Sequence, residues 1–102
     1  AANYLIGEYP AEGWNQDFAR KALRWERRME FAMEGDRFFD LVRWGIAEET
    51  MNSYIVVEQN KRVYYRGARF IGGRDEYLPI PNAQYNFSEG TYVQNPGYGK
   101  FN

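Results

Sequence analysis

Residues 26–45 read ERRMEFAMEGDRFFDLVRWG and combine charge, aromatic bulk and glycine in one stretch. Together with the residues before it, this stretch places apolar side chains at helical spacing over 14–34 and basic side chains on the opposite face. Asn15 or Asp17 is suited to cap the start of this helix, because a short side-chain oxygen accepts a bond from a free backbone amide. Gly35 is expected to end the helix, since glycine adopts the left-handed conformation of a C-cap most easily.

A second, short helix is predicted over 36–44, with Gly45 as its stop. Arg37, Asp40 and Arg43 fall three residues apart on one side of it, so the aspartate can pair with either arginine. An exposed pair of this kind contributes only about 0.2–0.5 kcal/mol, whereas a buried set matters through the cost of breaking it. We predict a structural ion network across both helices, made of Glu26, Arg27, Arg28, Glu30, Arg37, Asp40 and Arg43.

The remainder of the chain predicts one more helix and long loops. Residues 46–61 follow the helical rhythm, although the β-branched run 55–57 leaves a strand open. Residues 63–70 alternate too loosely for a confident strand. Residues 77–81 should be extended, because each proline disfavours helix in the residue before it. A single turn is expected at 82–85, and the tail after it reads as loop.

The composition excludes several function classes. A net charge of −1 gives no broad electrostatic surface for nucleic acid. The absence of cysteine and histidine removes disulfides, thiolate catalysis, the commonest zinc ligand and the usual general base. No apolar run approaches the roughly 20 residues that span a bilayer. At 102 residues the chain forms one domain at most, and its 19% aromatic content suggests extensive contact with another layer of protein.

Three blocks of the sequence carry a resemblance to a known family. The stretch 26–45, the sequence GRDEYLPIP at 73–81 and the sequence QNPGY at 94–98 resemble the C-terminal part of the SusD/RagB family and stand in the family's order. Asp36 departs from the pattern, since family members often carry a bulkier polar residue there. The resemblance implies a mainly α fold: the C-terminal helical part of a SusD-like protein with long ordered loops. Residues 1–102 would then lack the N-terminal helical-repeat part and would not form a complete independent domain.

The resemblance also implies a function. Members of this family capture nutrients, mostly glycans or oligosaccharides, at the cell surface of Bacteroidetes during polysaccharide utilisation. They act as lid lipoproteins on SusC-like TonB-dependent transporters of the outer membrane, facing the outside of the cell. The expected partners are therefore the transporter, the glycan and the rest of the SusD-like protein, without nucleic acid. The lipid anchor would belong to an N-terminus not present in this chain. No cofactor, metal or catalytic residue is expected.

Sugar binding requires aromatic platforms with polar rims, because the C–H face of a pyranose stacks on a ring while its hydroxyls need hydrogen bonds. Tyr64, Tyr65 and Tyr77 are candidate ligand contacts on this chemistry, against the simpler interpretation that they pack within the protein. Leu78 and Ile80 are expected to pack against the helices while the neighbouring prolines stiffen the turn.

Two other classes of function stay open. Glu26, Glu30 and Glu34 recur every four residues, and a carboxylate-based glycoside hydrolase domain would need such groups facing each other across a cleft. Each has an arginine within helical reach, which favours ion pairs over catalysis. A structural subunit of a surface complex is the other alternative. Asp75 and Glu76 could converge on calcium, but they lie in no twelve-residue calcium loop, so no metal site is predicted.

Overall fold

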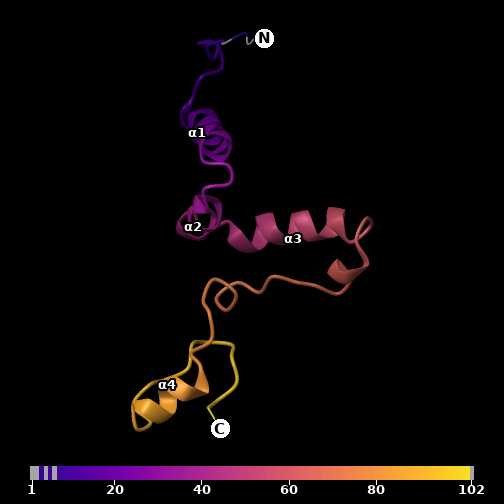
Figure 1. The fold of residues 1–102 in the computed structure, drawn as a ribbon. Coiled ribbons are helices and arrows are strands. Elements are labelled where there is room, and N and C mark those ends of the chain that lie inside the picture. Colours follow the sequence, from indigo (N-terminus) through magenta and orange to yellow (C-terminus); the bar gives the residue numbers. More distant parts are fainter. Residues whose placement is uncertain (1–2, 4, 6, 102) are drawn as a thin grey trace. The chain divides into compact units, whose positions relative to one another are not determined.

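The computed structural model describes residues 3, 5 and 7–101, and within this part the chain is helical, with no strand (Figure 1). Its helices are α1 (Gln16–Glu30), α2 (Asp36–Arg43), α3 (Ala47–Glu58), the 3-10 helix η1 (Val63–Tyr65) and α4 (Asn82–Phe87). The prediction of a mainly α fold is confirmed. The chain divides into two compact units, Ala1–Arg37 and Phe38–Asn102.

Helix α1 begins where the sequence predicts. The side-chain oxygen of Asn15 accepts a hydrogen bond from the amide of Phe18 at 2.9 Å, which satisfies one of the free donors of the first turn. The rings of Tyr9, Trp14 and Phe18 contact one another around this start, with centroids 5.3–5.9 Å apart. The cap and the aromatic contacts together fix the point at which the chain enters the helix.

Helix α1 ends at Glu30, four residues before the predicted end, so the prediction that Gly35 is its C-cap is wrong. Phe31 is the C-cap instead, with φ −99° and ψ 21°, and its amide still bonds Arg27. Met33 then takes a positive φ of 69°, and Gly35, with φ 85°, lies directly before α2. The apolar rhythm through residue 33 indicates a face of the helix and not its length: the side chain of Met33 is fully exposed.

Gly45 ends α2 as predicted, and it does so in a Schellman motif. Its amide bonds the carbonyl of Val42 at 3.0 Å, and the amide of Ile46 bonds the carbonyl of Leu41 at 3.0 Å. The φ of 69° at Gly45 is the left-handed conformation that this motif needs. Ile46 packs on the cluster that contains Leu41, which is the apolar contact that commonly accompanies the motif. The motif turns the chain directly into α3.

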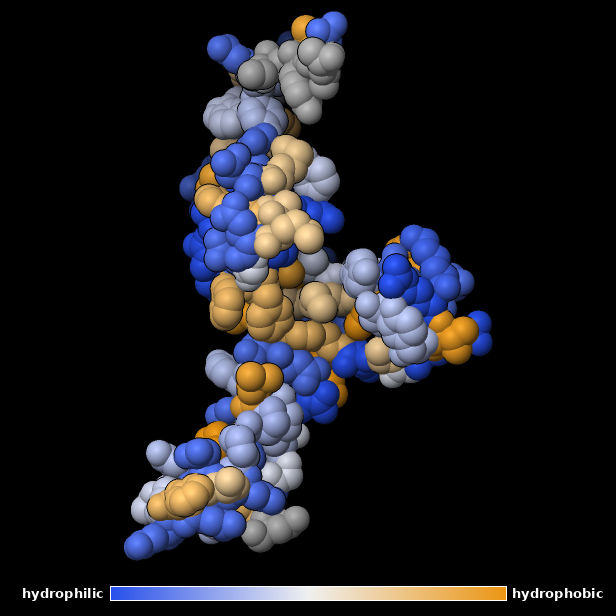
Figure 2. Space-filling model, viewed as in Figure 1, coloured by the Kyte–Doolittle hydropathy of each residue, from blue (hydrophilic) through white to orange (hydrophobic). Residues whose placement is uncertain are grey.

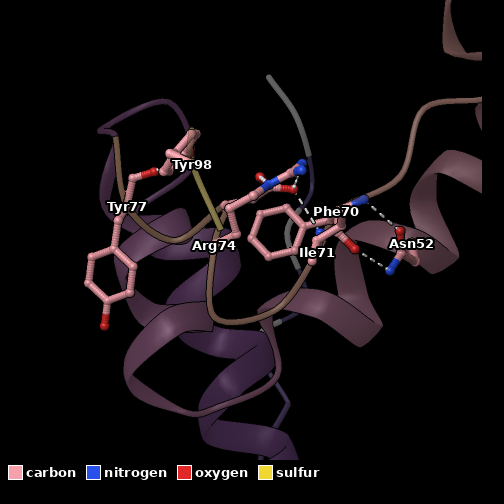
Figure 3. Close-up of polar contacts among 7 residues, drawn as sticks. Asn52, Phe70, Ile71, Arg74, Tyr77 and Tyr98 are labelled. Carbon is pink, nitrogen blue, oxygen red and sulfur yellow. Dashed lines mark hydrogen bonds and ion pairs between the residues drawn. The ribbon is translucent and has the colours of Figure 1, made fainter. Parts of the chain in front are cut away.

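The core of the second unit forms around this corner. Leu41 from α2 and Ala47 from α3 are each 3% exposed, and Phe70 from the later loop is 8% exposed. Partly buried apolar side chains complete the cluster: Phe38, Val42, Ile46 and Met51. The side-chain amide of Asn52 bonds both the amide and the carbonyl of Phe70 at 2.9 Å (Figure 3). This pair holds the segment after η1 alongside α3 (Figure 1).

Helix α3 is confirmed as a helix, and it includes the β-branched run 55–57. The turn expected at 82–85 is a slightly longer helix, α4. Many large apolar side chains are exposed, among them Trp25 and Met29 on α1 at 53% and 52%. Figure 2 shows apolar surface in several separate places on the face it presents. Within the described part of the chain, every helix is too short or too polar to cross a bilayer.

Candidate functional site

Asp40 is the buried member of the predicted ion network. Its residue is 4% exposed, and its Oδ1 accepts a hydrogen bond from Nε of Arg43 at 2.8 Å. The guanidinium of Arg43 also lies over the ring of Trp44, 5.0 Å from its centroid. The side chain of Arg43 is 55% exposed, so solvent screens one side of this pair. The predicted pairing of Asp40 with Arg43 is therefore present in the structure.

The members of the network on α1 make contacts with aromatic residues. Glu26 accepts a hydrogen bond from the hydroxyl of Tyr9 at 2.8 Å, and this bond raises the pKa of Tyr9. Burial and the nearby charge of Glu26 act in the same direction. The guanidinium of Arg27 lies 4.7 Å from the ring centroid of Phe31. These contacts lie within the first unit and stabilise α1.

Three more residues of the predicted ion network lie on α1 and α2. The guanidinium of Arg28 lies 5.2 Å from the ring centroid of Trp25. Glu30 is exposed at the end of α1, and Arg37 is half-buried in the first turn of α2. That the whole set fixes α1 against α2 stays a prediction.

Three tyrosines gather beside the end of α3, and we call Tyr54, Tyr64 and Tyr65 the tyrosine cluster. The rings of Tyr64 and Tyr65 lie 4.6 Å apart at 41°, and the ring of Tyr54 meets that of Tyr65 at 6.2 Å and 84°. Tyr64 is 69% exposed and Tyr54 is 51% exposed, while Tyr65 is half-buried between them. The tight turn η1 brings the two neighbouring tyrosines back onto α3. The cluster thus presents aromatic surface on a held scaffold.

Charged side chains surround the tyrosine cluster. Glu58 forms ion pairs with Lys61 at 3.2 Å and with Arg62 at 3.6 Å. Arg62 Nη1 donates a hydrogen bond to the hydroxyl of Tyr64 at 2.9 Å. This bond, followed by the charge of Glu58, raises the pKa of Arg62. The electrostatic interaction with Tyr54, followed by burial, raises the pKa of Tyr65.

Sequence reasoning found Tyr64 and Tyr65 but missed the rest of this arrangement. Tyr54, Glu58 and Arg62 recur every four residues, which is the spacing that places side chains on one face of a helix. That spacing is the signal from which the rim could have been found. An exposed ring beside donors and acceptors suits the stacking of a sugar ring whose hydroxyls form hydrogen bonds at its edge.

Tyr77, the third predicted contact, belongs to a different arrangement. Its backbone carbonyl accepts a hydrogen bond from the hydroxyl of Tyr98 at 2.6 Å (Figure 3). Its own side chain is 54% exposed. Among the contacts of the described residues, none joins the ring of Tyr77 to the tyrosine cluster. The structure thus brings together two of the three predicted tyrosines.

The contact between Tyr98 and Tyr77 is one of several between the QNPGY and GRDEYLPIP blocks. Gln94 accepts from the amide of Ile80 at 2.8 Å and donates to its carbonyl at 3.0 Å. Asn95 Nδ2 donates to the carbonyl of Leu78 at 2.7 Å. We call these contacts of Gln94, Asn95 and Tyr98 the loop brace. It gives two of the blocks that carry the resemblance a structural role.

The loop brace corrects one expectation. Leu78 is 84% exposed, so the prediction that its side chain packs against helices is wrong within the described residues. The backbone carbonyl of Leu78 is the group that is held. Gly97 adds a close contact, because a Cβ there would lie 2.7 Å from Cγ of Arg74. The aliphatic stem of Arg74 therefore lies against the glycine of the QNPGY block.

Asp75, a conceivable calcium ligand from the sequence, uses its carboxylate within its own loop. Oδ2 accepts from the amide of Ile71 at 2.7 Å, and Oδ1 accepts from Nε of Arg74 at 2.6 Å (Figure 3). The Arg74 bond first, and the Ile71 bond second, lower the pKa of Asp75. Across the described residues, no three acidic side chains gather where they could hold a metal ion.

Comparison with known proteins adds a finding that covers all three blocks. The model of the SusD family matches residues 2–98 of the chain. No curated protein matches the chain.

Proposed function

Because the chain belongs to the SusD family, we propose that it captures glycan or oligosaccharide at the cell surface as the lid lipoprotein of a SusC-like TonB-dependent transporter. The family indicates a glycan-binding role in nutrient uptake. The transporter partnership, the outer-membrane location on the extracellular face and the lipid anchor are parts of our proposal. The match over residues 2–98 is the observation that carries it.

We assign the glycan contact within this chain to the tyrosine cluster. The ring of Tyr64 is the most exposed of the three, and the ring of Tyr65 lies against it at 4.6 Å. Arg62 and Lys61 supply donors at the edge, and Glu58 supplies acceptors. A pyranose stacked on Tyr64 would meet hydrogen-bonding groups at its rim. Tyr77 remains a second candidate contact outside this cluster.

Capture in this proposal is non-covalent. The rings bury the C–H face of the sugar, and the rim exchanges hydrogen bonds to water for hydrogen bonds to sugar hydroxyls. No bond of the glycan is formed or broken, and the bound ligand passes to the transporter when the lid closes. The ion network and the loop brace serve as scaffold. The exposed apolar side chains of α1 support further packing against the rest of the SusD-like protein.

Isothermal titration against a panel of oligosaccharides tests the assignment. Tyr64→Ala should weaken binding of the preferred glycan by about tenfold, because it removes the ring surface buried against the sugar, and a loss of about 1.4 kcal/mol corresponds to a tenfold weaker affinity. Tyr64→Phe should bind within about threefold of the parent, since it keeps the ring and loses one hydrogen bond. Val63→Ala is the matched control, because Val63 lies in the same turn and is also 69% exposed.

The same samples separate the alternatives. Release of reducing ends from a glycan that binds would contradict capture without chemistry and favour the hydrolase alternative. A complete lack of binding across the panel would favour a structural subunit of a surface complex. Binding that Tyr64→Ala leaves unchanged would move the site away from the tyrosine cluster while keeping the capture function.

A further inference from the structure

The tail of the chain forms an open pocket of about 500 Å³, which we call the tail pocket, and its lining shares no residue with the tyrosine cluster. This volume falls within the about 300–1,000 Å³ typical of small-molecule sites. The residues that line it all fall within the range 85–101, and both Tyr85 and Phe101 are among them. Those two rings stack on each other with centroids 4.3 Å apart and planes at 17°. The pocket therefore has a preformed aromatic wall.

Several polar groups that line the pocket are already occupied. The amide groups of Gln94 and Asn95 hold the backbone of the YLPIP segment. The hydroxyl of Tyr98 donates to the carbonyl of Tyr77. What the lining offers to a ligand is therefore the half-exposed ring of Tyr92 and the ammonium of Lys100. The contacts of the loop brace use neither of these two groups.

The charged side chain in the lining of the pocket is positive. Lys100 is the charged residue among those that line it, and none of the lining residues is acidic. Aromatic walls accept the C–H face of a pyranose, and a lysine in a lining that holds no acidic residue favours an anion. The ammonium acts as a point charge, so it suits a carboxylate or a sulfate group equally.

We propose that this pocket is a second glycan subsite that takes an anionic pyranose, with Lys100 bonding its acidic group and Tyr92 stacking on its ring. The ligand class rests on the proposed function, since glycan capture is what brings a sugar to this surface. The tyrosine cluster recognises the ring and its hydroxyls. The tail pocket recognises charge.

The test uses the purified protein and three trisaccharides: an oligogalacturonide, its neutral, fully methyl-esterified form, and a galactose trisaccharide sulfated once per ring. The acidic oligogalacturonide, the sulfated sugar, or both should bind about fivefold more tightly than the methyl ester, and this preference should fall as salt rises. The two acidic ligands separate carboxylate from sulfate as the recognised group. Ligand protection in hydrogen exchange should fall on residues 85–101.

Lys100→Met should abolish the preference while leaving binding of the neutral ester unchanged. Lys21→Met is the matched control, because Lys21 is an exposed lysine on α1 in the first unit. A preference that survives Lys100→Met, or protection confined to residues 54–65, would overturn the subsite. If neutral glycans bind at the tyrosine cluster and acidic ones gain nothing, the subsite fails and the proposed function stands. If no glycan of any kind binds, both fail.

Discussion

The side-chain amide of Asn52 forms hydrogen bonds with both backbone groups of Phe70, each at 2.9 Å. The side chain of Asn52, on α3, thereby forms the two hydrogen bonds that a neighbouring strand would otherwise form with Phe70. It satisfies the backbone amide and the backbone carbonyl of a residue whose ring is buried. Because Phe70 is 8% exposed and belongs to the core with Leu41 and Ala47, the pair joins the helical corner to the loops that follow.

Asn52→Ala should lower the free energy of unfolding by about 2 kcal/mol, because two part-buried backbone groups lose their partners. Urea denaturation followed by circular dichroism measures this. Asn60→Ala is the control: its exposed amide bonds the carbonyl of Val56 within one turn, and its loss should change the free energy by less than about 0.5 kcal/mol. Equal effects of the two variants would contradict a special role for Asn52.

Gly97→Ala should destabilise the tail by about 2 kcal/mol. The φ of 81° at this position strains any residue with a Cβ, and the new methyl group would overlap the stem of Arg74. Gly99→Ala is the matched control, because no atom lies within 4 Å of its Cβ position. Hydrogen exchange of residues 77–81 reports the local change. If the two variants exchanged alike, the contact between Arg74 and Gly97 would carry no stability.

Tyr98→Phe should weaken the loop brace by about 1 kcal/mol, since it removes the donor to the carbonyl of Tyr77 and keeps the ring. Hydrogen exchange in residues 77–81 should become faster, while the exchange rate in α3 should change little. Tyr92→Phe, in the same tail and 50% exposed, should leave this exchange unchanged. An unchanged rate in Tyr98→Phe would show that Gln94 and Asn95 suffice to hold the segment.

Asp75 predicts a dependence of stability on pH. Its pKa is lowered from the ordinary value of 3.8, first by the bond from Arg74 and then by the bond from the amide of Ile71. A lowered pKa in the folded state means that the carboxylate stabilises the fold above pH 3.8 and that this contribution disappears as pH falls through the folded-state pKa. Asp75→Asn should therefore be less stable than the parent at neutral pH.

The difference between Asp75→Asn and the parent should shrink as the pH drops below 3.8. Thermal melts of the two proteins from pH 7 down to pH 2.5 measure it. A difference that stays constant over this range would mean that the charge of Asp75 does not contribute.

The helices could be predicted from the sequence because their signals are local. Asn15 supplies a cap oxygen, and Gly45 supplies a left-handed stop at the end of an amphipathic run. The end of α1 could not, because the rhythm through Met33 continues after the backbone has left the helix. Sequence spacing indicates which residues share a face of a helix. It does not indicate the backbone φ and ψ angles at Phe31, where the helix ends.

The candidate sites divide in the same way. Tyr64 and Tyr65 are neighbours in sequence, so their contact follows from a single tight turn. The loop brace joins residues 14–21 positions apart, and side-chain amides that bond backbone groups leave no periodic trace. The tail pocket depends on the loop conformation of residues 85–101, and residue spacing in a loop does not predict that conformation.

The loop brace holds residues 78–80 by their backbone, and this has a practical consequence. Pro79 and Pro81 lie at the two positions beside Ile80, whose own amide must donate, so a proline shifted to residue 80 would remove the donor that Gln94 accepts. The side chain of Leu78 is exposed and is not part of the loop brace. In a chain without native cysteine, Leu78→Cys would give a single attachment point for a fluorophore that senses movement of this loop as ligand arrives.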